Sequence, residues 1–143
     1  MNGRVLIDTN ILVYIYDSLD SVKQERAIAI VDRLIQTTCA VVSPQIMGEF
    51  LIATTRANRP LLAPREAIAR MRNYLVACQV VDITQLITLE ALRGVESHHF
   101  PFWDAQIWAT ARLNQIAEVY SEDFNPGATV EGVRFTNPLT NDF

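Results

Sequence analysis

Four acidic residues, far apart in the sequence, occupy positions from which carboxylates can do chemistry. Asp8 directly follows the largely apolar run 4–7, and Asp123 lies just beyond the run 116–120, which is rich in apolar residues. Both runs are typical of buried strands, and ligands of open α/β sheets bind beyond the carboxyl ends of the strands. We therefore expect the Asp8 and Asp123 side chains at one rim of a sheet.

The other two acids, Glu49 and Asp104, lie on helical stripes that are otherwise apolar. Within each stripe the residues follow the i, i+3, i+4, i+7 spacing of one helix face. Such a face packs against a sheet, so each helix is expected to direct one carboxylate, near its N-terminal end, toward the interior. The two stripes are Ile46, Glu49, Phe50, Ala53 and Asp104, Ile107, Trp108, Ala111.

A carboxylate on a buried stripe must be hydrogen-bonded, paired or bound to a metal, because desolvating it alone is costly. Basic partners are scarce, since Lys23 is the only lysine and most arginines fall in segments that read as exposed. If the four acids converged to about 5 Å, each ionised pair would repel by roughly 3 kcal/mol at an effective dielectric near 20. This favours a hard divalent cation, Mg²⁺ or Mn²⁺, because no cysteine or histidine has zinc-ligand spacing.

Alternating strands and helices must position these acids. The alternation predicts right-handed crossovers and a mainly parallel sheet with helices on both faces. The predicted strands are 4–7, 39–42, 79–83, 116–120 and 133–135, and the predicted helices are 11–17, 21–36, 45–57, 63–77, 84–97 and 102–115.

The totals favour one globular domain that spans residues 1–143. Half of the residues are hydrophobic and 20% are charged, which is enough apolar mass for a sizeable core. Asp8 and Asp17 bound the longest early apolar stretch, so no run approaches the roughly 18 residues of a membrane span. The first residues lack the apolar core of a signal peptide. We therefore expect a soluble, cytoplasmic protein with no membrane partner.

A cluster of arginines interrupts an otherwise acidic chain of net charge −4. It contains a single acid, Glu66. Such a cluster is either a solvated helical face or a surface for phosphate or an acidic partner. Its members are Arg56, Arg59, Arg65, Arg70 and Arg72.

Four parts of the chain carry a resemblance to a known family. They are Ile7-Asp8-Thr9-Asn10-Ile11-Leu12, Glu49 in the helix after the second strand, Phe102-Trp103-Asp104-Ala105-Gln106-Ile107, and Ser121-Glu122-Asp123-Phe124. Together they resemble the acidic signatures of PIN-domain nucleases, and their order and spacing are most similar to the VapC-type toxins of bacterial toxin–antitoxin pairs. The resemblance covers essentially the whole chain and implies a three-layer PIN-like α/β fold, with a mainly parallel sheet flanked by helices.

The resemblance also implies roles for individual residues. Glu122 stands beside the fourth acid and could assist or replace it. The implied activity is Mg²⁺- or Mn²⁺-dependent cleavage of RNA, and the implied partners are the RNA substrate, a cognate antitoxin and a second copy of the chain. The arginine cluster would contact RNA or antitoxin. The implied metal-site acids are Asp8, Glu49, Asp104 and Asp123, and the implied supporting residues are Asn10 and Ser121.

Other interpretations stay open. Each acid by itself has a structural explanation, such as a helix cap at Asp8 or a first-turn acid at Asp104. A phosphoaspartate receiver needs a lysine late in the chain, which is absent, and a haloacid-dehalogenase-like phosphatase needs an acid at the position of Asn10. A PIN-like module that binds RNA or protein without cutting is the remaining alternative.

Two pairs of residues precede or accompany the third acid. His98 and His99 are expected to be helix caps or surface residues rather than metal ligands. Phe102 and Trp103 could stack on a base, yet beside a buried helix they are expected in the core.

Overall fold

The computed structural model describes residues 3–56, 58–140 and 143. Within them, six strands form one sheet in the order β3-β2-β1-β4-β6-β5. Neighbouring strands run parallel except β5, which is antiparallel to β6, so the predicted mainly parallel sheet is confirmed. The strands are β1 (Val5–Ile7), β2 (Ala40–Val42), β3 (Gln79–Val80), β4 (Glu118–Tyr120), β5 (Thr129–Val130) and β6 (Val133–Thr136).

Strand β1 lies in the middle of the sheet and brings the first and last acidic motifs together. It pairs with β2 on one side and with β4 on the other. All three of its residues are buried, as expected for a strand covered on both faces. The backbone N–H of Asp8 donates to the Tyr120 carbonyl at 2.9 Å. The carboxyl ends of β1 and β4 therefore lie side by side.

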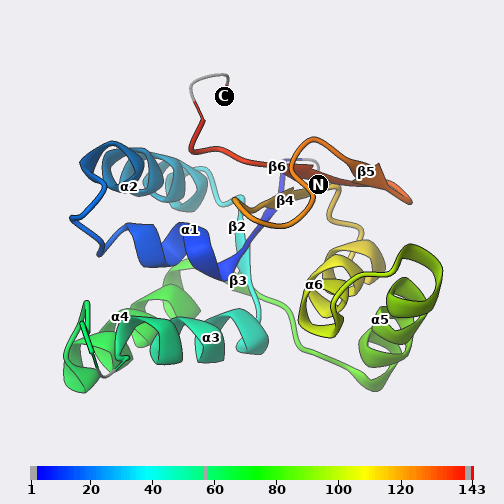
Figure 1. Cartoon of the computed structure of the whole chain (residues 1–143), viewed down its shortest axis with the longest axis horizontal. Helices are drawn as coiled ribbons and strands as arrows, with labels where there is room; N and C mark the ends of the chain where they lie inside the picture. The colour runs from blue at the N-terminus through cyan, green and yellow to red at the C-terminus, as the bar shows by residue number, and fades with distance from the viewer. Residues whose placement is uncertain (1–2, 57, 141–142) are drawn as a thin grey trace.

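Helices lie on both sides of the strands, as predicted. Figure 1 shows α1 to α4 grouped on one side and α5 with α6 on the other. Helices α5 and α6 approach closely at Gly94, where an added Cβ would lie 2.9 Å from the Trp108 ring. The helices are α1 (Thr9–Tyr14), α2 (Ser21–Gln36), α3 (Pro44–Thr54), α4 (Pro64–Ala77), α5 (Gln85–His98) and α6 (Phe102–Leu113).

Two helices that carry site residues begin directly after strands. The Asp8 side chain accepts from the backbone N–H of Thr9 at the start of α1. Ser43 caps α3 by accepting from the Ile46 N–H at 3.3 Å, and Pro44 is the first helical residue. Because few residues separate the ends of β1 and β2 from these helices, the sheet fixes where both helices start.

Two short elements differ from the predictions. Strand β3 ends at Val80, although Val81 still donates to the Val42 carbonyl at 3.0 Å. Strand β5 is absent from the predicted elements, because two residues are too short for a periodic pattern. It joins β6 through Glu131 and Gly132, whose φ angles are 50° and 85°, so this turn is a local feature with little hydrophobic signal.

The buried hydrophobic residues form one cluster that includes both faces of the sheet. Its largest fully buried side chains include Trp108 of α6, Phe50 of α3 and Phe135 of β6. In the part of the chain that the structure describes, we find no helix whose length and apolar character would suit a membrane span.

Candidate active site

Asp8 is held in place by neutral donors. It is only 6% exposed. Its Oδ1 accepts from the Thr9 N–H at 2.7 Å, and its Oδ2 accepts from the Ser121 hydroxyl at 2.7 Å. The Ser121 oxygen is also buried between partners, since it accepts from the Phe124 N–H at 3.2 Å. None of these donors carries a charge, so Asp8 is oriented without being neutralised.

Burial raises the pKa of the Asp8 carboxyl from its ordinary 3.8 to about 6. Hydrogen bonds from Ser121 and Thr9 lower this pKa, whereas the negative charges of Glu49 and Asp104 raise it. Burial also raises the pKa of Asp104, with further contributions from Glu49 and Asp123. These acids therefore lie close enough to disfavour one another's ionisation.

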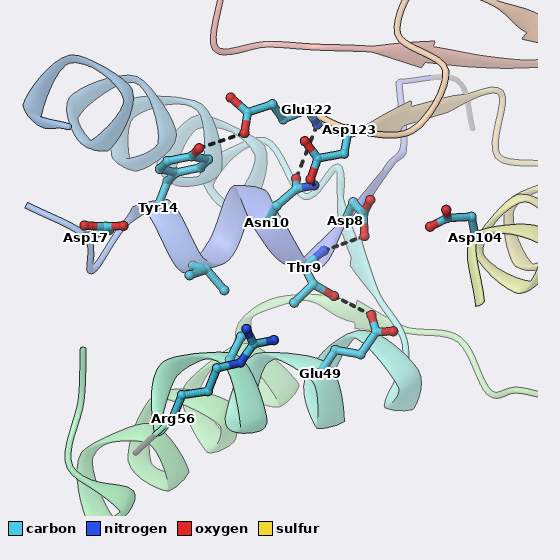
Figure 2. Close-up of a pocket in the computed structure, with 12 residues that line it drawn as sticks. Asp8, Thr9, Asn10, Tyr14, Asp17, Glu49, Arg56, Asp104, Glu122 and Asp123 are labelled. Carbon is cyan, nitrogen blue, oxygen red and sulfur yellow. Dashed lines mark hydrogen bonds between the residues drawn. The ribbon is translucent and has the colours of Figure 1, made fainter. Parts of the chain in front are cut away.

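Asn10 connects the fourth acid to α1. Its Nδ2 donates to Asp123 Oδ2 at 3.3 Å, and its Oδ1 accepts from the Glu122 N–H at 3.3 Å. The Glu122 side chain turns toward α1 and α2, where it accepts from the Tyr14 hydroxyl at 2.7 Å and lies 2.6 Å from Lys23 Nζ. Figure 2 shows Asp123 beside Asn10 and Glu122 beside Tyr14. The two neighbouring acids thus have different partners, a neutral amide for Asp123 and an ammonium for Glu122.

Glu49 on α3 is held by a chain of neutral side chains that the sequence patterns did not reveal. It accepts from the Thr9 hydroxyl at 2.7 Å and from Gln45 Nε2 at 3.2 Å. Gln106 on α6 donates to Gln45 Oε1 at 2.9 Å and accepts from the Thr88 hydroxyl at 3.1 Å. These bonds connect α5, α6 and α3, and thereby fix the Glu49 carboxylate relative to the helix that carries the third acid.

All four predicted acids line one pocket of about 480 Å³. Six carboxylates line it in total, because Asp17 and Glu122 join the predicted four. Figure 2 shows Asp8 between Asp104 on one side and Arg56 on the other. Of the described residues that line the pocket, Arg56 alone is basic. Acids that are distant in sequence, from β1, α3, α6 and the end of β4, therefore share one opening.

The chemistry of the pocket fits a hard divalent cation. Among the described residues, no three acidic, histidine or cysteine side chains already stand in a ready-made metal site. The lining acids nonetheless supply carboxylate oxygens in a pocket where burial and mutual repulsion raise the pKa values of Asp8 and Asp104. A cation with a preference for oxygen would relieve both penalties. The residues that could hold it are Asp8, Glu49, Asp104 and Asp123.

The sequence of this chain matches the model of a recognised family. The family model described as "PIN domain" matches residues 5–127, a range that contains all four acids. The chain belongs to the PIN domain family. The fold expected from the resemblance is therefore confirmed for this PIN domain.

Several solved structures have a similar fold. VapC20 of Mycobacterium tuberculosis, described as a toxin that cleaves the sarcin-ricin loop, is 18% identical with a TM-score of 0.65, covering 85% of this chain and 91% of its own. A toxin–antitoxin complex from Klebsiella pneumoniae is 19% identical with a TM-score of 0.65, covering 94% and 97%. DNA-bound VapBC from Salmonella typhimurium is 15% identical with a TM-score of 0.66, covering 96% and 99%. No curated protein matches the sequence.

The predicted arginine cluster divides into two groups in this PIN domain. Arg56 lines the acidic pocket and, together with Arg59, an adjoining cavity of about 820 Å³. The two cavities share Val13, Asp17, Ala53 and Arg56, so they form a continuous depression. The other three arginines are exposed on α4 and line neither cavity: Arg65, Arg70 and Arg72.

Trp103 was expected in the core, and this prediction is wrong. Its side chain is 59% exposed, while that of Phe102 is half-buried. The buried part of α6 begins at Ala105, so the first turn of the helix extends beyond the core. A hydrophobic residue in a first turn gives no sequence signal for which of these two environments it occupies.

The tandem histidines are cap and surface residues, as expected. His98 is the last residue of α5, and its Nε2 lies 2.6 Å from Glu131 Oε2. His99 forms the C-cap in the left-handed conformation with a φ of 58°. Neither histidine lines the acidic pocket.

Proposed function

We propose that this PIN domain is a metal-dependent endoribonuclease of the VapC type, the toxin of a type II toxin–antitoxin pair. The observation that carries the proposal is the convergence of Asp8, Glu49, Asp104 and Asp123 on one pocket in a chain of this family. The pocket contains no nucleophilic serine or cysteine and no histidine among its described lining residues. Its chemistry therefore rests on carboxylates and on what they bind.

Mg²⁺ or Mn²⁺ is the cofactor we propose, since the lining ligands are carboxylate oxygens and PIN-domain nucleases generally use divalent metals. When bound, such an ion neutralises the scissile phosphate and lowers the pKa of water for in-line attack. Asp8 would be the central ligand, with Glu49, Asp104 and Asp123 around it. The protein's own contribution is to orient Asp8, Glu49 and Asp123 with uncharged donors, so that their charge stays available.

The supporting residues act through these acids. Ser121 and Thr9 fix the two oxygens of Asp8, and Asn10 holds Asp123 toward the pocket. We assign the fourth position to Asp123 rather than Glu122, because Lys23 and Tyr14 already satisfy the Glu122 carboxylate. Glu122 would instead fix the loop after β4 against α1 and α2.

RNA is the proposed substrate, and we propose that its backbone enters along the depression that contains Arg56 and Arg59. Guanidinium groups there would pair with phosphates, and the contact would weaken with salt. The exposed α4 arginines, Arg65, Arg70 and Arg72, would serve RNA or an acidic antitoxin segment outside the pocket. Because the substrate would be RNA, we propose that the protein acts in the cytoplasm.

Two protein partners complete the proposal. One of these structural neighbours is described as a toxin–antitoxin complex, and another as DNA-bound VapBC. By analogy we propose a cognate antitoxin for this chain, and a homodimer as its assembly. Size-exclusion chromatography with light scattering would measure the mass of the free chain, and a monomeric mass at micromolar concentration would refute the dimer.

The deciding experiment uses the purified chain, free of antitoxin, and labelled RNA. Cleavage is expected with Mg²⁺ or Mn²⁺ and none with EDTA. Asp8→Asn is expected to be inactive, and Asp82→Asn, an exposed acid that does not line the pocket, is the matched control with native activity. Cleavage that persists in EDTA, or full activity in Asp8→Asn, would reject the mechanism. RNA binding without cleavage in either metal would favour the non-catalytic PIN-like module.

A further inference from the structure

An exposed tryptophan directly precedes Asp104, one of the acids that line the pocket. Trp103 is the second residue of α6 and precedes Asp104, and 59% of its surface is exposed. The other tryptophan of the chain, Trp108, is fully buried, and its indole N–H donates to the Val130 carbonyl at 3.1 Å. A ring as large as that of Trp103 gains free energy when it is covered. Its exposure next to a candidate catalytic acid therefore suggests a ligand contact.

The backbone at Trp103 is fixed relative to the site acids. One amide group, Gln45 Nε2, donates both to the Trp103 carbonyl at 3.1 Å and to Glu49 Oε2 at 3.2 Å. The oxygen of the same amide, Gln45 Oε1, accepts a hydrogen bond from Gln106 Nε2 at 2.9 Å. The Phe102 ring packs edge-on against the Trp103 ring, with centroids 4.9 Å apart and an interplanar angle of 74°. Gln45 thus fixes the Trp103 backbone, which carries the indole, relative to the Glu49 carboxylate.

The charges around the pocket decide which part of an RNA suits each side. Asp8 lies between Asp104 and Arg56 in Figure 2. Phosphates would be attracted on the arginine side and repelled by the carboxylates on the Asp104 side, since Arg56 alone is basic among the described residues that line the pocket. A nucleobase is uncharged and has two flat faces, so it can approach the Asp104 side without that repulsion. Stacking on an aromatic ring needs no charge and tolerates any base.

We propose that Trp103 is the stacking platform for a nucleobase of single-stranded RNA next to the phosphodiester at the acidic pocket. The proposal rests on RNA as the substrate of the proposed function and adds a residue that selects for unpaired bases. A base inside a duplex has both faces covered by its neighbours, so the platform would favour loops and single strands.

The test separates base contacts from phosphate contacts. Asp8→Asn protein, which is expected not to cut, is titrated in Mg²⁺ with a fluorescein-labelled oligoadenylate and with an abasic oligomer of the same length and charge. Binding of the oligoadenylate is expected to be about tenfold tighter, as for one stacked base. This preference should disappear when Trp103→Leu is added and persist with Trp103→Tyr, which keeps an aromatic face.

A matched control and a second readout sharpen the test. Leu86→Ala, which removes a 70% exposed apolar side chain that does not line the pocket, should leave the preference for bases unchanged. Oligoadenylate should also quench tryptophan fluorescence, and the quenching should vanish in Trp103→Tyr, which retains only the buried Trp108. An unchanged preference in Trp103→Leu would overturn the proposal. RNA cleavage by the native chain, measured in parallel, tests the nuclease proposal independently of this result.

Discussion

Acidic residues gather in two places in this PIN domain, and their surroundings are opposite. In the pocket, Asp8 and Asp104 are near other acids and their pKa values are raised. Away from the pocket, a cluster of five residues that are not buried joins α5 and α6 to the turn before β6, and each acid in it is paired with basic side chains. Its members are Glu90, Arg93, His98, Arg112 and Glu131.

In this paired cluster, basic side chains of the protein itself balance the negative charges of the two glutamates. Glu90 accepts from Arg93 at 2.7 Å, and Glu90 Oε2 lies 2.9 Å from Arg112 Nη1. Glu131 accepts from Arg93 at 2.8 Å and lies 2.6 Å from His98. Hydrogen bonds from Arg93 and then His98 lower the pKa of Glu131 to about 2.

The difference shows what each group of acids can do. Paired carboxylates have their charge neutralised within the fold, so they contribute to structure. In the pocket, Asp8, Glu49 and Asp123 are oriented by hydroxyl and amide donors without charge, so their charge must be balanced by something that binds. The comparison would break if substitutions in the two groups had similar effects on activity and stability.

The largest effect is expected at Asp8. Asp8→Asn should lower the rate of RNA cleavage on the order of 10³-fold, comparable to the loss of a key electrostatic group in an active site. Its fold should persist, because asparagine has the same shape and replaces a carboxylate whose ionisation burial disfavours. Single-turnover kinetics measures the rate of cleavage, and thermal unfolding measures whether the fold persists. Unfolding of the variant at room temperature would show that Asp8 is structural.

The second expected effect concerns pH and metal. The folded pKa of Asp8 is about 6, above its ordinary 3.8, so without metal this group destabilises the native state as pH rises from about 4 to about 6. A bound cation needs the ionised form, so protons compete with it below pH about 6, and Mg²⁺ affinity should fall up to tenfold per pH unit there. Melting temperatures with and without Mg²⁺ across this range test it. Stabilisation by Mg²⁺ that is independent of pH would refute the role of Asp8.

A third, smaller effect is expected for the amide chain behind Glu49. Gln45→Ala removes one donor to Glu49 and the contact with Gln106. Metal affinity or kcat should fall about tenfold, the lower end for residues that orient a metal ligand. A metal titration measures the metal affinity, and cleavage kinetics at saturating metal measures kcat. Gln24→Ala on α2, which donates to the Ile15 carbonyl at 3.0 Å instead, is the control with native activity.

The smallest effect on activity is expected in the paired cluster. Glu131→Gln should leave RNA cleavage unchanged and lower the free energy of unfolding by less than about 1 kcal/mol, as for surface ion pairs. Because the pKa of Glu131 is lowered, its stabilising contribution is present above pH about 4.5 and is lost as pH falls toward 2. Urea unfolding at neutral and acidic pH measures this. A large loss of cleavage would show that the two regions are coupled.

Much of the architecture could be predicted from local sequence. The run 4–7, the cap and proline at Ser43 and Pro44, and the periodic stripe of 21–36 each predict one element, and the structure has all three. Short elements could not be predicted, as β5 and the early end of β3 show. A strand of two residues is too short for a detectable hydrophobic periodicity. The four acids were found because strand ends and helix stripes have fixed geometry.

What could not be predicted is how side chains meet across elements. The sequence could not separate Glu122 from Asp123, because both follow β4 and only their partners in the fold distinguish them. These partners are Lys23 and Tyr14 for Glu122, and Asn10 for Asp123. The same holds for the Gln45–Gln106 bond, whose residues are 61 positions apart.

The amino-acid sequence by itself determined the alternation of strands and helices and the place of each acid on its own element, because hydrophobic periodicity and helix capping act over a few residues. Only the tertiary structure decided which acids pair with a basic side chain and which arginines line the pocket. It also decided that Trp103 is exposed. Those outcomes depend on distances between separate elements, which the packing of the core sets.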